Sequence, residues 1–293
     1  MNLVLDFGNT KIKAAVFSES NEILEIFTWE EYSEVTINEV KCKYLIDSVL
    51  LCSVVDISER IENHLKSNFS FYIRLNSSTS LPIKNNYSTP ETLGVDRIAA
   101  AVGANKLCPN TPLLVIDLGT AITYDFVNSD NEYEGGNIAP GVNMRLRAMN
   151  KFTNKLPLLE AREENKLLGD DTSSAMMAGV LRGIEFEIEG YISEISKKNP
   201  NLSVFLTGGD VFFFEKRVKS SIFVVSNLLL VGLNEILRFN NENSEIAKLK
   251  QKELFLAIIP ETLKYLPPIL FTSPVIVVTT EKLPSFTRTP FLC

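Results

Sequence analysis

The sequence is poor in the residues that build metal centres and disulfide frameworks. It contains one histidine and four cysteines among 293 residues. The single histidine, His64, has no partner nearby in the sequence, so a Ser/His/Asp triad or a histidine-based metal site has little to build on. The cysteines form no close pair, and even the shortest gap, Cys42 to Cys52, matches no zinc-binding spacing. We expect free thiols in a reducing compartment.

The sequence also lacks an excess of positive charge and a membrane-length apolar run. Its 29 Lys+Arg against 36 Asp+Glu give a net charge of -7, whereas a general nucleic-acid binder carries a basic footprint. The longest uncharged stretch, residues 265–280, is short for a membrane span and contains prolines. The N-terminus has no positive leader region, and Asp6 interrupts its apolar run. We expect a cytoplasmic protein that binds neither nucleic acid nor membranes.

One pattern occurs twice in the chain. An apolar run at 3–5 is followed by Asp6 and Gly8, and an apolar run at 113–116 is followed by Asp117 and Gly119. The aspartates and the glycines are offset by 111 residues in both cases, and a strand-like segment follows each turn. A repeat of this size indicates duplicated halves rather than a solenoid.

Helical and strand-like segments alternate along most of the chain. A third apolar run ends in the turn at 207–210, and helical spacing of apolar residues marks 176–195. Interleaved strands and helices predict an α/β protein. We expect halves at residues 1–110 and 111–244, joined by the proline-containing turn at 109–112, and an appended tail at 245–293 of unknown role.

The two glycine turns have the chemistry of a phosphate site. Glycine lets the backbone approach phosphate oxygens, and a carboxylate at a strand end can hold a cation. One such turn alone is in most cases only a hairpin connection, but two turns at equal strand positions in facing halves predict a nucleotide cleft. No GxxxxGK[ST] loop occurs. Further donors and positive charges near the turns come from Asn9, Thr10, Lys11, Lys13 and Thr120.

Other motifs could form the second side of a site. Gly94 precedes a helical segment, so Asp96 is either a helix-start acid or a base for a hydroxyl proton. Arg97 is either a surface residue or a clamp for a substrate oxygen. The segment 135–141 reads as a glycine-rich loop, facing a ligand or simply turning the chain, and 170–175 reads as a helix N-cap.

Taken together, the motifs resemble those of type III pantothenate kinases, in the acetate and sugar kinase, Hsp70 and actin superfamily. The resemblance covers about residues 1–240. The matching motifs are Asp6–Lys13 (DxGNTxxK), Tyr87 with Gly94–Arg97 (GxDR), Asp117–Thr123 (DxGTAxT), Gly135–Gly141 (GGxIxPG), Thr172 and the turn at 207–210. It implies two actin-like (ribonuclease H-like) half-domains with a nucleotide cleft between them. Family members commonly end near residue 240, so the tail is a departure.

The resemblance implies a role for each matching position. The enzyme would phosphorylate pantothenate to 4'-phosphopantothenate, the first step of coenzyme A biosynthesis, with Asp96 as the base. It would use ATP with Mg²⁺ near Asp6 and a monovalent cation, K⁺ or NH4⁺, at Asp117. The ATP-binding residues would be Asp6, Phe7, Gly8, Asn9, Thr10, Lys11, Ile12, Lys13 and Thr120. The pantothenate-binding residues would be Tyr87, Gly94, Val95, Asp96, Arg97 and Thr172. The protein would be a homodimer with a pocket completed across the interface.

Two alternatives remain open from the sequence. A nucleotide-binding regulator or transcription accessory protein of the same fold would need no acceptor-side residues. A kinase of the same fold for another small hydroxy acid would keep them, because the sequence does not define the shape of the pocket. The set Tyr87, Asp96, Arg97 and Thr172 favours an enzyme.

Overall fold

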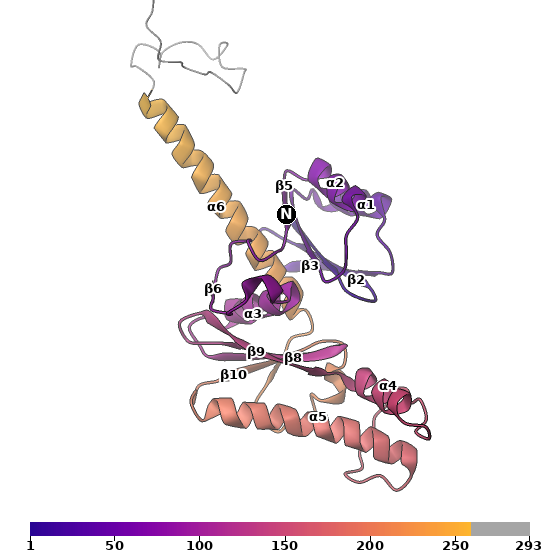
Figure 1. The fold of residues 1–293 in the computed structure, drawn as a ribbon. Coiled ribbons are helices and arrows are strands. Elements are labelled where there is room, and N and C mark those ends of the chain that lie inside the picture. The colour runs from indigo at the N-terminus through magenta and orange to yellow at the C-terminus, as the bar shows by residue number, and fades with distance from the viewer. Residues whose placement is uncertain (259–293) are drawn as a thin grey trace, which may run out of the picture. The chain divides into compact units, whose positions relative to one another are not determined.

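A computed structural model describes residues 1–258 of the chain (Figure 1). The chain divides into two compact units, residues 1–243 and 244–293. The first unit contains two β-sheets and the helices packed on them. Of the predicted tail, residues 245–258 continue the last helix, and residues 259–293 lie outside the described part.

The first sheet has five strands in the order β3-β2-β1-β4-β5. Its elements are β1 (Asn2–Phe7), β2 (Ile12–Phe17), β3 (Ile23–Trp29), α1 (Glu34–Tyr44), β4 (Ser48–Ser53), α2 (Glu59–Asn68) and β5 (Phe71–Arg74). Strands β1 and β2 form an antiparallel hairpin, and β4 pairs with β1 in parallel. Apolar residues of α1 and α2 cover one face of this sheet.

The second sheet repeats this topology. Its order is β11-β10-β7-β8-β9-β6, with an antiparallel β7–β8 hairpin and a parallel β10. Its strands are β6 (Lys84–Asn85), β7 (Leu113–Leu118), β8 (Ala121–Val127), β9 (Glu132–Pro140), β10 (Ser203–Thr207) and β11 (Phe223–Val224). Because β7 takes the place of β1 and β8 that of β2, the sequence repeat is a repeat of topology, and the predicted α/β fold with duplicated sheets is confirmed.

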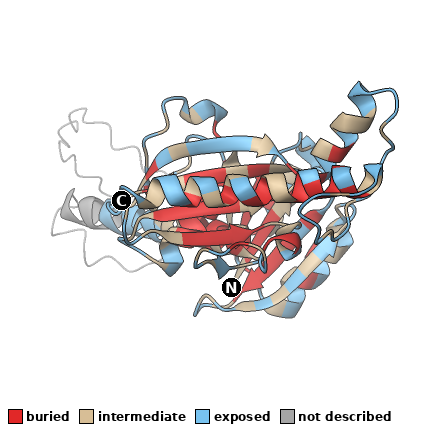
Figure 2. Ribbon diagram, turned by 90° about the horizontal axis from the view of Figure 1, so that it is seen from below, coloured by how far each residue is buried: buried red, intermediate tan, exposed pale blue. Residues whose placement is uncertain are grey.

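Helices cover both faces of the second sheet. They are the 3-10 helix η1 (Pro90–Thr92), α3 (Val95–Leu107), α4 (Val142–Phe152), α5 (Thr172–Ser196), the 3-10 helix η2 (Val211–Phe213) and α6 (Leu228–Ile258). Alternate β7 residues point to opposite faces: Leu114 packs with α5, whereas Val115 packs with α3 and the start of α6. Seen from below, α5 crosses the buried strands with its outer face exposed (Figure 2).

The apolar cluster around α3 also includes residues of the first sheet. Val4, Ala15 and Leu50 belong to the same buried cluster as Val115 and Phe205. The helices α3 and α6 therefore pack against both sheets. This arrangement places the first turn of α3 within reach of the hairpin turns of both sheets.

The structure corrects one prediction and supports others. Residues 135–140 are not a loop: they belong to β9, paired in register with β8. The glycines of this segment suggested a loop, but Gly136 is needed for a different reason. The backbone of β8 lies so close that a Cβ on Gly136 would be 2.0 Å from the carbonyl oxygen of Tyr124. The helix predicted over 176–195 is present as part of α5. Cys42, Cys52 and Cys108 are free thiols, and Cys293 lies outside the described residues.

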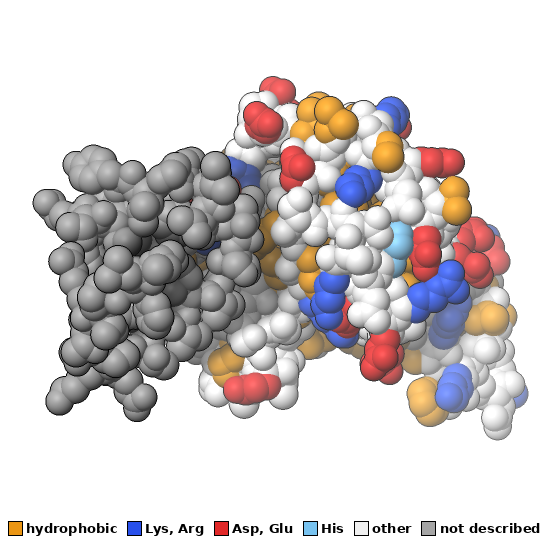
Figure 3. Space-filling model, turned by 90° about the horizontal axis from the view of Figure 1, so that it is seen from above, with side chains coloured by type: hydrophobic (Ala, Val, Ile, Leu, Met, Phe, Trp, Pro, Cys, Tyr) orange, Lys and Arg blue, Asp and Glu red, His pale blue; other side chains and the backbone are white. Residues whose placement is uncertain are grey.

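Residues 108–112 connect α3 to β7, and the division into halves at residue 110 stays a prediction. None of the helices described within residues 1–258 is long and apolar enough to cross a membrane. On the face drawn in Figure 3, acidic and basic side chains are interspersed. The expectation that the protein binds no nucleic acid also stays a prediction.

Candidate active site

A cavity of about 450 Å³ lies where the glycine turns of the two sheets meet. Its lining comes from the β1–β2 turn, the β7–β8 turn, the first turn of α3, the turn after β10 and the start of α6. The cavity brings together nine residues that the sequence predicted for the site: Asp6, Gly8, Asn9, Thr10, Lys13, Asp96, Arg97, Asp117 and Thr120.

Each hairpin turn is closed by a hydrogen bond from its glycine amide, across residues 8–11 in the first sheet and the shorter turn 119–121 in the second. The Gly8 amide donates to the carbonyl oxygen of Lys11 at 3.1 Å, and the Gly119 amide donates to that of Ala121 at 3.2 Å. Each turn thus closes on itself, while Asn9 and Thr120 beside it stay exposed. Exposed turn amides and hydroxyls in a cavity are suited to bind the oxygens of a phosphate chain.

The turn after β10 packs against the Asp117 carboxylate. Gly208 has a φ of +100°, and a Cβ there would lie 2.5 Å from both the Asp117 Oδ1 atom and the Leu118 carbonyl oxygen. Only glycine fits this conformation and this space. The segment Thr207–Gly209 therefore brings the backbone to the cavity wall without displacing Asp117.

Three carboxylates face the cavity and influence one another. Burial and, after it, the charge of Asp96 raise the pKa of Asp6 to about 7, although Lys13, opposite Asp6 in the hairpin, acts to lower it. Burial also raises the pKa of Asp117 to about 6, again with a contribution from Asp96. Like charges gathered in a partly buried site favour protonation or a bound cation.

The carboxylates at the cavity are too few to hold a metal ion by themselves and fit a cation that is held mainly by bound phosphate oxygens and water. Within the part of the chain that the structure describes, no group of three or more Asp, Glu, His or Cys side chains is close enough to form a metal cage. Magnesium in phosphate-transfer sites is usually held by one or two carboxylates together with phosphate oxygens and water. Asp6 and Asp117 supply carboxylates of that kind.

The N-terminus of α3 forms another side of the cavity, the one for which the sequence predicts acceptor-binding residues. Gly94 precedes the helix, and the Arg97 amide donates to the Asp96 Oδ1 atom at 2.9 Å. A Cβ on Gly94 would lie 2.5 Å from that same oxygen. The glycine therefore leaves room for the Asp96 carboxylate, which is half-buried and faces the cavity.

The sequence profile of the type III pantothenate kinase family matches residues 2–194. A curated type III pantothenate kinase from Phocaeicola vulgatus is 44% identical over 242 residues, which cover 83% of this chain and 100% of the relative. Another from Christiangramia forsetii is 43% identical and covers 82% of this chain and 99% of the relative. The chain belongs to the type III pantothenate kinase family.

Solved structures with low sequence identity share the fold. A candidate Baf family transcriptional activator from Campylobacter jejuni has a TM-score of 0.53 at 22% identity, over 82% of this chain and 99% of that one. A candidate 2-dehydro-3-deoxygalactonokinase from Sinorhizobium meliloti also has a TM-score of 0.53, at 11% identity, over 81% and 98% of the two chains. At these identities the likeness concerns the fold alone, the actin-like fold of sugar kinases.

Some positions matching the family's motifs lie outside the cavity. Phe7 and Ile12 are buried in the core of the first sheet, where they anchor the hairpin turn. Lys11 lines a neighbouring cavity of about 290 Å³ on the other side of that turn.

His64, which the sequence left without a role, forms a hydrogen bond with the hydroxyl of Tyr32.

Three further acceptor-side positions lie around the cavity rather than in its lining. Gly94 and Val95 form the start of α3. The Tyr87 ring is half-buried, and its centroid lies 5.8 Å from the Arg97 guanidinium carbon. At this distance, the ring can support the guanidinium through a cation–π contact.

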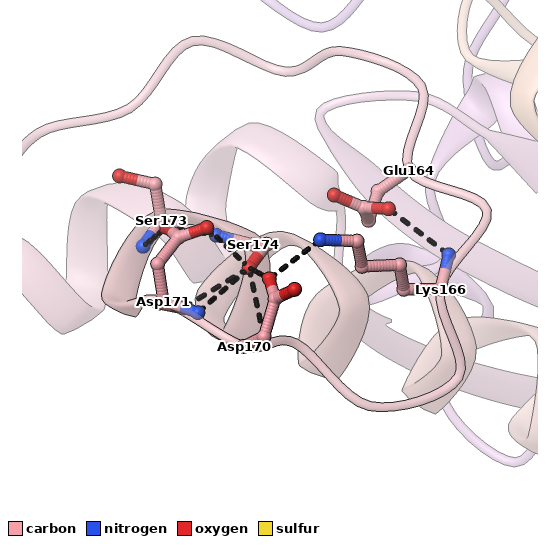
Figure 4. A network of polar contacts seen from close by, with 6 residues as sticks. All are labelled: Glu164, Lys166, Asp170, Asp171, Ser173 and Ser174. Atoms are coloured by element: carbon pink, nitrogen blue, oxygen red, sulfur yellow. Dashed lines mark hydrogen bonds and ion pairs between the residues drawn. The ribbon is translucent and has the colours of Figure 1, made fainter.

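Thr172 is separate from the other acceptor-side residues. It is exposed at the start of α5 and does not line the cavity. Asp171 caps this helix by accepting from the Ser173 and Ser174 amides, as the sequence predicted, within the polar network of Figure 4. The cap fixes the backbone at Thr172 while its side chain remains accessible.

The sequence analysis missed the contribution of α6. Ser226, Asn227, Leu229 and Leu230 line the cavity beside the Gly208 turn. The signal was available: a Ser-Asn pair before an apolar run is typical of a helix start. A second omission was Asp125, a charged residue within the apolar strand β8.

Proposed function

We propose that the protein transfers the γ-phosphoryl group of ATP to the hydroxyl of pantothenate, giving 4'-phosphopantothenate and ADP. The observation that carries this proposal is the single cavity in which glycine turns from both sheets face the carboxylates of Asp6, Asp96 and Asp117. Membership of the type III pantothenate kinase family supports the identity of the acceptor.

The reaction needs positioning and charge neutralisation more than covalent catalysis. The turn residues Gly8–Thr10 and Thr120 bind the phosphate chain, and Lys13 adds positive charge beside it. Asp96 accepts the proton of the pantothenate hydroxyl while the oxygen of that hydroxyl forms the new bond to phosphorus. The bond from phosphorus to the bridging oxygen breaks, and ADP leaves.

The carboxylates suit the two cations of the proposal. Magnesium bound with ATP would neutralise phosphate charge, and Asp6 would hold it. Asp117 would hold the monovalent cation, K⁺ or NH4⁺. Both side chains are ionised more readily when a cation lies beside them, which opposes the raised pKa values caused by burial.

We also propose that the enzyme acts as a cytoplasmic homodimer. Thr172 is exposed and lies outside the cavity lining of its own chain. If Thr172 binds pantothenate, a second copy can supply it to the pocket lined by Asp96 and Arg97. The capped, rigid start of α5 is suited to such a contact.

The first test is ADP release by the purified protein with ATP, Mg²⁺ and pantothenate, with and without K⁺ or NH4⁺. We expect turnover that requires pantothenate and increases strongly with the monovalent cation. Omission of pantothenate is the control for ATP hydrolysis. Absence of pantothenate-dependent turnover in a folded protein that binds ATP would exclude the proposed reaction and favour a regulator or another hydroxy-acid acceptor.

A second prediction concerns Arg97 and the acceptor. Arg97→Ala should raise the KM for pantothenate about tenfold or more while the KM for ATP changes little, because loss of a charge-assisted hydrogen bond costs about 1.5–3 kcal/mol. The kinetic constants should be referred to sites titrated with an ATP analogue. An unchanged pantothenate KM would rule out Arg97 as a ligand of the acceptor.

A further inference from the structure

A buried ion pair lies directly behind the acceptor side of the cavity. Asp125 of β8 is fully buried, and the Arg97 side chain is only 6% exposed. The Arg97 Nε and Nη2 atoms both donate to the Asp125 Oδ1 atom, at 2.9 and 2.7 Å. Arg97 also lines the cavity, so its guanidinium group joins the cavity wall to the core of the second sheet.

Other side chains fix the geometry of this pair. The hydroxyl of Tyr133, on β9, donates to the same Asp125 Oδ1 atom at 2.6 Å. Gly136, opposite Asp125 in the β8–β9 register, leaves space for the pair: a Cβ there would lie 2.7 Å from Asp125 Oδ1 and 2.8 Å from Arg97 Nη2. Thus Gly136, within the family's GGxIxPG motif, accommodates an ion pair.

A buried ion pair such as Arg97–Asp125 adds little net stability to a protein core. Removing two charges from water offsets most of their attraction, and apolar side chains of similar volume are often as stabilising. The Asp125 Oδ2 atom is buried and has no hydrogen-bond partner within the described residues, which adds to the cost. The pair therefore needs a benefit other than stability, and its contact with the first turn of α3 provides one.

We propose that Asp125 is a positioning residue for phosphoryl transfer: it orients the Arg97 guanidinium group and holds the first turn of α3, with Asp96, at the cavity wall. Two guanidinium donors are committed to Asp125, which fixes the plane of the group and leaves other donors for a ligand. This inference rests on the proposed role of Arg97 as an acceptor ligand.

The test compares Asp125→Asn with wild type and with the milder variant Tyr133→Phe, which removes one donor to Asp125. We expect Asp125→Asn to raise the KM for pantothenate about 10- to 100-fold, the usual effect of losing an outer partner of a ligating side chain. The KM for ATP should change less than about twofold, because Gly8–Thr10 and Thr120 are untouched. Tyr133→Phe should shift the pantothenate KM in the same direction by a smaller factor.

Glu185→Gln is the matched control. Glu185 is also a buried carboxylate paired with an arginine, Arg182, but neither residue lines the cavity. The control should leave both KM values within about twofold of wild type. KM does not depend on the concentration of active enzyme, and kcat is referred to sites titrated with an ATP analogue, so partial unfolding of a variant does not enter either constant.

The outcomes separate this inference from the proposed function. If Arg97→Ala raises the pantothenate KM but Asp125→Asn and Tyr133→Phe leave it unchanged, the pair is only structural and the inference is wrong. If both KM values rise together in Asp125→Asn, the cavity has lost its shape generally, and the inference is also wrong. If Arg97→Ala itself has no effect on the pantothenate KM, the proposed role of Arg97 fails, and the inference fails with it.

Discussion

Asp96→Asn is expected to lower kcat by about 10²–10⁴-fold, the usual contribution of a general base. The amide keeps the size of the carboxylate and can still accept the Arg97 amide proton, so the first turn of α3 should be retained. What the variant loses is the ability to take up the hydroxyl proton. The measurement is the steady-state kcat for ADP release, with ATP binding determined separately by calorimetry.

Electrostatics give this prediction a second, independent readout. The charge of Asp96 contributes to the raised pKa values of Asp6 and Asp117, so its removal should lower both. More of each carboxylate is then ionised near neutral pH, which favours a bound cation. The affinity for ATP with Mg²⁺ should therefore stay the same or increase while kcat falls.

The control for this experiment is Glu91→Gln, in η1 just before α3. Glu91 is exposed and does not line the cavity, so the same loss of one negative charge should leave kcat unchanged. Near-wild-type turnover of Asp96→Asn would exclude Asp96 as the base. A parallel loss of kcat and ATP affinity would instead mean that the variant disrupts the cavity.

The fold and the parts of the site that lie in turns and at a helix start can be predicted from local sequence patterns. The turns after β1 and β7 are recognisable because each combines an apolar run, an aspartate and a glycine over a few residues. Gly94 and Asp96 are recognisable for the same reason, since they mark the start of a helix. These features depend on neighbours in the chain, which a single sequence displays directly.

Features that depend on tertiary packing could not be predicted in this way. Gly136 looks like a loop glycine in the sequence, and only the approach of β8 shows why a strand needs it there. The Arg97 side chain could bind a ligand or pair with a carboxylate of the protein. The sequence does not show which, because its partner Asp125 lies 28 residues away. The contribution of Asn227 likewise depends on where α6 starts in space.

The helices α3 and α6 cross with their backbones in close approach, and this crossing gives the last prediction. In the crossing of α3 and α6, a Cβ on Gly232 would lie 1.8 Å from the carbonyl oxygen of Ala99, and one on Gly103 would lie 2.3 Å from that of Leu228. Both obstacles are backbone atoms, which cannot turn away as a side chain can. A single methyl group at Gly232 must therefore push the two helices apart.

Gly232→Ala should consequently lower the free energy of unfolding by about 3 kcal/mol, the upper end of the usual cost of overpacking. For a chain of 293 residues, that corresponds to a fall in Tm of roughly 5 °C. The kcat of the remaining folded protein should also fall, because α3 carries Asp96 and the start of α6 carries Asn227 on the cavity wall. Thermal unfolding and site-titrated kinetics measure the two effects.

Gly190→Ala is the matched control for this variant. Gly190 is exposed on α5, and nothing lies within 4 Å of the Cβ that alanine would add. Alanine is favoured over glycine in a helix by roughly 0.5–1 kcal/mol, so this variant should be slightly more stable than wild type. If Gly232→Ala were as stable and as active as Gly190→Ala, the α3–α6 crossing would not set the geometry of the site.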